Sequence, residues 1–240
     1  YNPALRFAPV DYDDLVILSV VKSVKNPLVF FYSDWGFGNN AYRPLNSLSI
    51  WIGYRLFNVS SGPNQLLNIL LHISVMVLLY LLIVRISKNI LIGFLATCLS
   101  LISLYTYSPA LWISDRPTLF VALVLLLTLN YLEACNDQRR PNSLVILAFS
   151  ILGLLSKESG LIVPLIAILI VYMKYGLSKE NRKLIISLFI TIIIYMIFRF
   201  LIFGRNATSY TESGYLYGFK YYKSSDELSP TMQLVATGEN

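Results

Sequence analysis

The feature that most constrains this chain is a series of long apolar runs separated by short polar segments. Leu66–Val84, Ile90–Tyr107, Leu119–Leu132 with its flanking residues, and Leu184–Phe203 each approach the roughly 20 residues that a helix needs to cross a bilayer core. Hydrophobic residues make up 56% of the sequence and charged residues 13%, a balance that is unusual for a soluble domain. The sequence therefore predicts an all-α, polytopic transmembrane protein.

The strong polar residues fall in separate connections between the apolar runs. They form four groups, each next to the start or end of a predicted helix: Asp13-Asp14, Arg43, Asp115-Arg116 and Lys157-Glu158. A simple count of spans places the four groups on one side of the membrane. Charged side chains held at membrane helix ends are costly and are generally kept for a function, so we expect chemistry at that surface.

The distribution of basic residues assigns the two sides of the membrane. The other connections carry most of the lysines and arginines, namely Arg85, Lys88, Arg139, Arg140, Lys174, Lys179, Arg182 and Lys183. By the positive-inside rule these connections face the cytoplasm. The four polar groups then face the non-cytoplasmic side of a bacterial plasma membrane or of the endoplasmic reticulum membrane.

The segment Ser143–Tyr175 tests this topology. It is apolar except for Ser156-Lys157-Glu158-Ser159 near its middle. A single helix would put the two neighbouring basic connections on opposite sides, whereas two short helices that meet at Lys157-Glu158 put both on the cytoplasmic side. We prefer two helices, each short for a full span and typical of broken or re-entrant segments.

We divide the chain into three parts. Residues 1–64 are predicted to form an external loop that holds the acidic pair and two amphipathic interface helices, over Leu15–Val24 and Pro44–Phe57. Residues 65–203 form a bundle of about six membrane helices, two of them short. Residues 204–240 form a polar, tyrosine-rich external segment that is incomplete. We expect a fragment that lacks its first helix and its C-terminal part.

The motifs, taken in order, resemble those of the GT-C superfamily of membrane glycosyltransferases. They are Asp13-Asp14, Tyr42-Arg43-Pro44-Leu45, Asn68-x-x-Leu71-His72, Trp112-Ile113-Ser114-x-Arg116 and Ser156-Lys157-Glu158. The chain is most similar to the protein O-mannosyltransferase-like group and its relatives that carry tetratricopeptide repeats. The resemblance implies an acidic pair at the catalytic centre, a sugar donor linked to a polyprenyl phosphate, and inversion at the anomeric carbon.

The acidic pair is the candidate for general-base catalysis. Transfer of a sugar to a hydroxyl group needs one base within hydrogen-bond reach of that hydroxyl. Following the position of the pair in the resemblance, we take Asp13 as the base and Asp14 as its close rival. The alternative is that both carboxylates cap the helix that starts near Leu15.

Three basic residues are candidates for binding the donor phosphate: Arg43, Arg116 and Lys157. Arginine suits this role because its planar fork matches phosphate oxygens. Each has an alternative role. Arg43 can anchor to anionic headgroups, Arg116 can pair with Asp115 across a helix N-terminus, and Lys157 can be hydrated at a turn.

Supporting roles fall to Glu158, Asp115, Asn68 and His72. Glu158 can orient the phosphate or a hydroxyl group. Asn68 and His72 lie one turn apart on one helix face, and either contact substrate or hydrogen-bond a neighbouring helix. One histidine and scattered carboxylates show no metal-ligand spacing. The sequence leaves open whether a divalent cation bridges Asp13 and a donor phosphate, and no cofactor is assigned.

The sequence thus predicts a hexosyltransferase, with mannose a candidate sugar, that uses a polyprenyl-phosphate donor and a hydroxyl acceptor on a protein, lipid or glycan. The basic stripe typical of nucleic-acid binding is missing from the sequence. One rival is a flippase or transporter of lipid-linked sugars, which predicts polar residues at mid-depth and internal repeats. The other is a catalytically inactive membrane subunit with the same fold.

Overall fold

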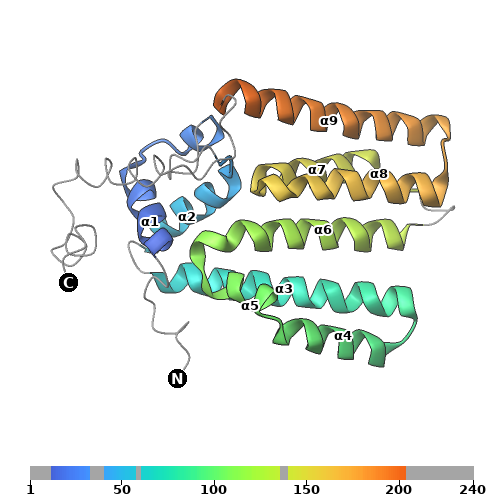
Figure 1. Ribbon diagram of the computed structural model, residues 1–240, viewed down its shortest axis with the longest axis horizontal. Helices are drawn as coiled ribbons and strands as arrows, with labels where there is room; N and C mark the ends of the chain where they lie inside the picture. Colours follow the sequence, from blue (N-terminus) through green and yellow to red (C-terminus); the bar gives the residue numbers. More distant parts are fainter. Residues whose placement is uncertain (1–11, 33–40, 58–60, 136–139, 204–240) are drawn as a thin grey trace.

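The computed structural model describes residues 12–32, 41–57, 61–135 and 140–203. Within these ranges every regular element is helical, with nine α-helices and three short 3₁₀ helices (Figure 1). The predicted segment 204–240 lies outside the described residues, as does the side chain of Asp13. The prediction of an all-α chain is confirmed for the described residues.

Four helices are long and apolar enough to cross a membrane. The spans are Gly62–Ser87, Ile113–Ala134, Glu158–Tyr175 and Lys179–Leu201. They correspond in turn to α3 (Ser61–Ser87), η3 (Ile113–Asp115) with α6 (Arg116–Ala134), η4 (Glu158–Leu161) with α8 (Ile162–Tyr175), and α9 (Lys179–Phe203). Two shorter apolar helices, α4 (Ile90–Ile102) and α7 (Ser143–Ser156), run beside them. The chain is therefore a multi-pass membrane protein by helix length and composition.

Asparagine side chains cap the N-termini of α4 and α7. The Asn89 side chain accepts hydrogen bonds from the backbone N–H groups of Leu91 and Ile92, and Asn142 accepts one from Leu144. These bonds satisfy amide groups that a helix leaves free in its first turn. At the end of α8, Gly176 takes a positive φ of 64°, a conformation that glycine adopts without a steric penalty.

The segment Ser143–Tyr175 folds as two helices, as predicted, but only the first is short for a full span, since Glu158–Tyr175 is long and apolar enough to cross a membrane. Helix α7 ends at Ser156, Lys157 is extended, and the 3₁₀ helix η4 (Glu158–Leu161) leads into α8. The two arms meet at a pair of glycines, because a Cβ atom on Gly160 would lie 1.8 Å from the carbonyl oxygen of Gly153. Lys157 and Glu158 therefore lie at the tip of a tight helical hairpin.

The apolar run Ile90–Tyr107 is not one continuous helix, and here the structure corrects the sequence-based expectation of a single span. Helix α4 ends at Ile102, Ser103 is extended, and α5 (Leu104–Leu111) begins after it. The hydroxyl of Thr106 donates to the backbone carbonyls of Ser100 and Ser103. The same two carbonyls also accept the backbone N–H groups of Ser103 and Thr106, at 3.2 and 3.1 Å, so they stay hydrogen-bonded where the helix is interrupted.

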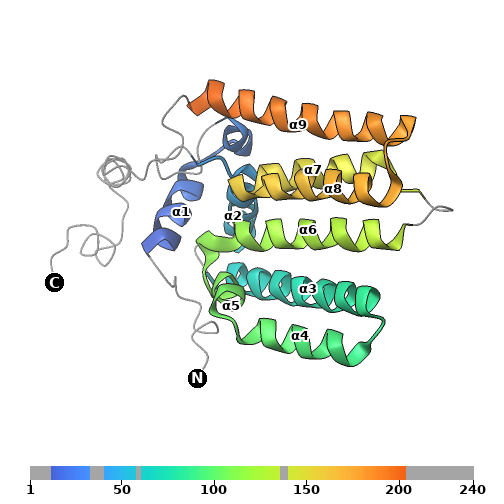
Figure 2. The same ribbon diagram turned by 45° about the vertical axis from the view of Figure 1, so that its right-hand side comes forward.

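The helices α1 (Tyr12–Ser23) and α2 (Pro44–Phe57) lie together at one end of the bundle, as a second view shows (Figure 2). Apolar residues of α1 and α2 pack with Ile113 in a small core. The buried face of α2 includes the polar residues Asn46 and Ser47, whereas Ile52 and Leu56 point outward. This polarity suits a helix whose outer face contacts lipid.

The opposite end of the bundle gathers basic side chains. Arg140 pairs with Glu180 at 2.6 Å and Lys174 pairs with Glu133 at 2.9 Å. Arg85 donates to the carbonyl of Asn130. The basic connections that the sequence assigns to one side thus share one end of the structure. Which end faces the cytoplasm stays a prediction.

Candidate functional site

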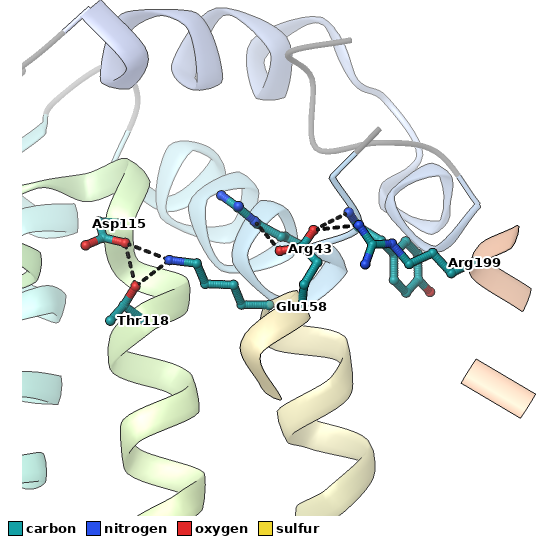
Figure 3. A network of polar contacts seen from close by, with 7 residues as sticks. Arg43, Asp115, Thr118, Glu158 and Arg199 are labelled. Atoms are coloured by element: carbon teal, nitrogen blue, oxygen red, sulfur yellow. Dashed lines mark hydrogen bonds and ion pairs between the residues drawn. The ribbon is translucent and has the colours of Figure 1, made fainter. Parts of the chain in front are cut away.

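Three of the polar groups that lie far apart in the sequence meet at the end of the bundle that carries α1 and α2. Figure 3 shows Asp115 and Thr118 on one side of the hairpin tip, and Glu158 between Arg43 and Arg199 on the other. We call Arg43, Asp115, Lys157, Glu158 and Arg199 the charge row. Three members are cationic and two are anionic, so the row carries a net charge of +1.

Glu158 receives hydrogen bonds from three donors, two of them on consecutive residues before α2 and one in α9. Its Oε2 atom accepts from Nε of Arg43 at 3.4 Å, and its Oε1 atom accepts from the backbone N–H of Tyr42 at 3.2 Å and from Nη2 of Arg199 at 3.5 Å. These distances exceed the roughly 2.7–2.9 Å typical of charge-assisted bonds. Glu158 therefore makes long contacts with all three donors.

Lys157 points to the other side of the tip, toward the start of α6. Its Nζ atom donates to Oγ1 of Thr118 at 2.8 Å and lies 3.3 Å from Oδ1 of Asp115. The Thr118 hydroxyl in turn donates to Asp115 at 2.5 Å. About a quarter of the Lys157 and Asp115 side chains is exposed, so this pair lies at the surface of the site (27% and 23%).

Arg116 is fully buried and makes hydrogen bonds to three neighbours. Nε donates to Oδ1 of Asn68 at 2.6 Å and Nη1 to Oγ of Ser49 at 2.9 Å. Nη2 donates to the backbone carbonyl and to Oδ1 of Asn64, at 2.9 and 3.0 Å. The guanidinium group thus ties α6 to α2 and α3. Its contact with a donor phosphate stays a prediction, and would require it to exchange some of these partners.

Two predicted site residues hold the segment that precedes α6. The Asn68 amide donates to the carbonyls of Pro109 and Trp112, at 3.0 and 2.9 Å. The buried Asp14 carboxylate accepts from the backbone N–H of Ser114, in the 3₁₀ helix η3 (Ile113–Asp115), at 2.8 Å. Its charge also acts on Arg116. Asp14 and Asn68 thus fix the backbone beside the charge row.

Asp13 lies on the first turn of α1, and the position of its carboxylate is outside the described residues. His72 lies one turn from Asn68, but the structure gives the two residues different surroundings. His72 borders a groove between α3 and α4, whereas Asn68 bonds to the segment after α5. Among the described residues, no cluster of three His, Cys, Asp or Glu side chains has the arrangement of a metal site.

An apolar groove of about 320 Å³ opens beside the charge row. It lies between α7 and α9 and is lined by residues that include Tyr42, Leu154, Tyr195 and Phe198. The Tyr42 ring packs edge-on against Phe198, and its hydroxyl donates to the carbonyl of Phe31 at 3.0 Å. Burial raises the pKa of the Tyr42 phenol, so it stays neutral at physiological pH.

Sequence reasoning missed several polar partners, chiefly Thr118, Ser49 and Asn64. Thr118 carried a usable signal, since it follows Asp115 at a spacing of three residues on a helix start. Ser49 and Asn64 carried none, because they reach Arg116 from separate helices. Comparison of the chain with protein-family models, with curated proteins and with solved structures finds no match.

Proposed function

We propose that this protein is a membrane glycosyltransferase of the GT-C type, which transfers a hexose from a polyprenyl-phosphate donor to a hydroxyl group with inversion at the anomeric carbon. One observation carries the proposal. Charged groups from the residue before α2, the end of η3, the tip of the α7–α8 hairpin and α9 come together beside an apolar groove, at one end of a membrane helix bundle. A lipid phosphate needs this combination of cations and apolar surface.

The chemistry of the groove and of the charge row suggests how the donor is held. The hydrocarbon tail lies against the apolar residues between α7 and α9. The phosphate lies at the cations Arg43, Arg199 and Lys157, which stabilise the negative charge that develops on it as the bond to the sugar breaks. The buried Arg116 side chain supports the charge row indirectly, through its hydrogen bonds to Asn68 and Ser49.

The reaction needs one base and one leaving group. The base takes the proton of the acceptor hydroxyl, the hydroxyl oxygen forms a bond to C1 of the sugar, and the bond from C1 to the phosphate oxygen breaks. Polyprenyl phosphate leaves with the electron pair of that bond. We assign the base to Asp13, because the neighbouring Asp14 carboxylate is buried and bonded to Ser114.

Replacing Asp13 with asparagine tests the proposed reaction. We expect the rate of transfer to fall by about 10²–10⁴-fold, the usual contribution of a general base. The measurement is transfer of labelled sugar from a panel of polyprenyl-phosphate sugars, by membranes that carry the full-length protein. Arg140→Gln, at the opposite end of the bundle, is the control and is expected to keep wild-type transfer.

The same assay separates the proposal from its rivals. Wild-type membranes that transfer no sugar from any donor, while labelled lipid crosses the bilayer, would indicate a flippase. Transfer that survives Asp13→Asn unchanged would remove the base assignment and leave the enzyme class intact. Absence of both transfer and lipid movement would favour an inactive subunit.

Replacing Glu158 with glutamine tests the place of the phosphate. The change removes the carboxylate that Arg43 and Arg199 now contact, so we expect polyprenyl phosphate to bind about fivefold more tightly, the scale of one partly exposed ion pair. The measurement is binding of polyprenyl phosphate without sugar to the purified full-length protein. Glu180→Gln removes a carboxylate from an arginine pair at the other end and should leave binding unchanged. Weaker binding by Glu158→Gln would place the phosphate elsewhere.

A further inference from the structure

The first turn of α9 carries a cluster of basic side chains at the end of the bundle opposite α1 and α2 (Figures 1 and 2). Arg182 and Lys183 follow Lys179 by three and four residues, so the three side chains share one face of the helix. We call them the basic trio. All three are exposed, and none forms an ion pair with another described residue. The nearby Glu180 carboxylate is held by Arg140 instead.

The corner between α8 and α9 is held by hydrogen bonds of a buried side chain. The Asn181 amide donates to the backbone carbonyls of Tyr175 and Gly176, at 2.9 and 3.1 Å. The backbone N–H of Asn181 donates to the Ser178 hydroxyl at 3.3 Å. These bonds fix the first turn of α9 against the end of α8. The basic trio is therefore presented from an ordered backbone, which lowers the entropic cost of binding an anion.

Further along α9, the face that carries the basic trio becomes apolar and stays exposed. Its residues recur every three or four positions and form what we call the isoleucine stripe, which consists of Ile186, Ile190, Ile193 and Ile197. The opposite face of α9, with Leu184 and Leu188, packs into the core of the bundle. Because α9 is long and apolar enough to cross a membrane, its outward stripe contacts acyl chains.

The length of the isoleucine stripe matches one leaflet of a bilayer. From Ile186 to Ile197 the helix rises about 16 Å. The hydrocarbon core of a bilayer is about 30 Å thick, so one leaflet contributes about 15 Å. The basic trio then lies at the headgroup level of the leaflet whose chains contact the stripe. One lipid molecule can contact both surfaces, with its phosphate at the trio and its chain on the stripe.

We propose that the basic trio and the isoleucine stripe together bind an anionic glycerophospholipid. Arg182 suits the phosphate because its planar fork matches two phosphate oxygens, and the two lysines add compact positive charges. A zwitterionic lipid carries a cation beside its phosphate, which the trio repels, so the site prefers a lipid with a net negative charge. The site lies at the opposite end of the bundle from the charge row and is independent of the proposed transfer reaction.

The test is photolabelling of the full-length protein in phosphatidylcholine vesicles, with a phosphatidylglycerol that carries a diazirine on its acyl chain. We expect labelled peptides from Ile186–Ile197. Unlabelled phosphatidylglycerol should compete with the label at least about fivefold better than added phosphatidylcholine, the factor that one basic residue supplies near an anionic surface. Sodium chloride at about 1 M should reduce this preference, because it screens exposed charges beyond about 3 Å.

Two triple variants that remove the same charge provide the control. Replacing every member of the basic trio with glutamine should abolish the preference for phosphatidylglycerol. Replacing Lys22, Lys25 and Lys88 with glutamine should preserve it, because these exposed lysines lie outside α9. Labelling of α9 itself should persist in both variants, since the isoleucine stripe stays in lipid, and this signal reports that α9 is still inserted.

Three outcomes would overturn the proposal. The first is equal competition by phosphatidylglycerol and phosphatidylcholine in the wild type. The second is loss of the preference in both triple variants, which would make it an effect of net charge alone. The third is competition by inorganic phosphate at the same concentration as the lipid, which would show that the basic trio binds a soluble anion without the acyl chain.

Discussion

Replacing Arg116 with leucine is expected to lower the free energy of unfolding by about 3–5 kcal/mol, the usual cost of removing one partner from a buried charge network. The guanidinium group is fully buried and donates to Asn68, Ser49 and Asn64. Leucine would remove the donor from these acceptors, and it would also remove the favourable charge interaction between Arg116 and the buried Asp14 carboxylate. Thermal unfolding of the purified full-length protein, followed by the loss of monodisperse material, measures the effect.

Two further variants show whether the loss of stability in Arg116→Leu comes from removing a buried charge. Arg140→Leu removes an arginine that is 57% exposed and should change stability by less than about 0.5 kcal/mol. The double variant Arg116→Leu with Asp14→Asn should recover part of the loss, because residue 14 then carries no charge for the missing arginine to stabilise. If Arg116→Leu is as stable as Arg140→Leu, then the network does not support the fold. If the double variant adds the two losses, the coupling to Asp14 is excluded.

Replacing Gly160 with alanine is expected to cost about 4 kcal/mol or more, at the upper end of single substitutions. The new Cβ would lie 1.8 Å from the carbonyl oxygen of Gly153 and 2.3 Å from its carbonyl carbon. Both atoms belong to the backbone of α7, so no side chain can move aside to make room. The hairpin of α7 and η4 must open instead, and Lys157 and Glu158 leave their positions in the charge row.

Two measurements test this expectation on the full-length protein. Thermal unfolding should show the loss of stability, and any folded remainder should bind polyprenyl phosphate less tightly than wild type. Ser159→Ala is the matched control, because Ser159 precedes Gly160 in η4 and is exposed. It should change stability by less than about 0.5 kcal/mol. A Gly160→Ala protein as stable as Ser159→Ala would show that α7 and η4 do not pack as described.

The two-helix nature of Ser143–Tyr175 could be predicted because charge is scarce in this chain. Lys157-Glu158 is the only charged pair in this apolar stretch. The connections before and after the stretch are both basic and so both face the cytoplasm, which requires the stretch to cross the membrane an even number of times. The same count placed Lys157 and Asp115 on one side of the membrane, whereas their contact was not predicted and is seen only in the structure. The break at Ser103 could not be predicted in this way, since it depends on a Thr106 hydroxyl that reaches two backbone carbonyls.

The surroundings of Arg116 show where sequence patterns give too little information. A charged residue at a helix end indicates either a ligand or buried partners, and the choice depends on residues that reach it from other helices. Ser49 is 67 residues away and Asn64 is 52. The polar, inward face of α2 has the same origin, because Asn46 and Ser47 are buried by packing with other elements. Local periodicity contains no information on such contacts.

The contact between Asp14 and Ser114 also sets an order of events during synthesis. The two residues are 100 positions apart, and Tyr42 and Glu158 are 116 apart. At about 5–20 residues per second, the Asp14 carboxylate leaves the ribosome about 5–20 s before the amide that it binds. The N-terminal helices therefore wait at the membrane while their partners are inserted. The charge row can be completed only after α9, which carries Arg199, has been synthesised.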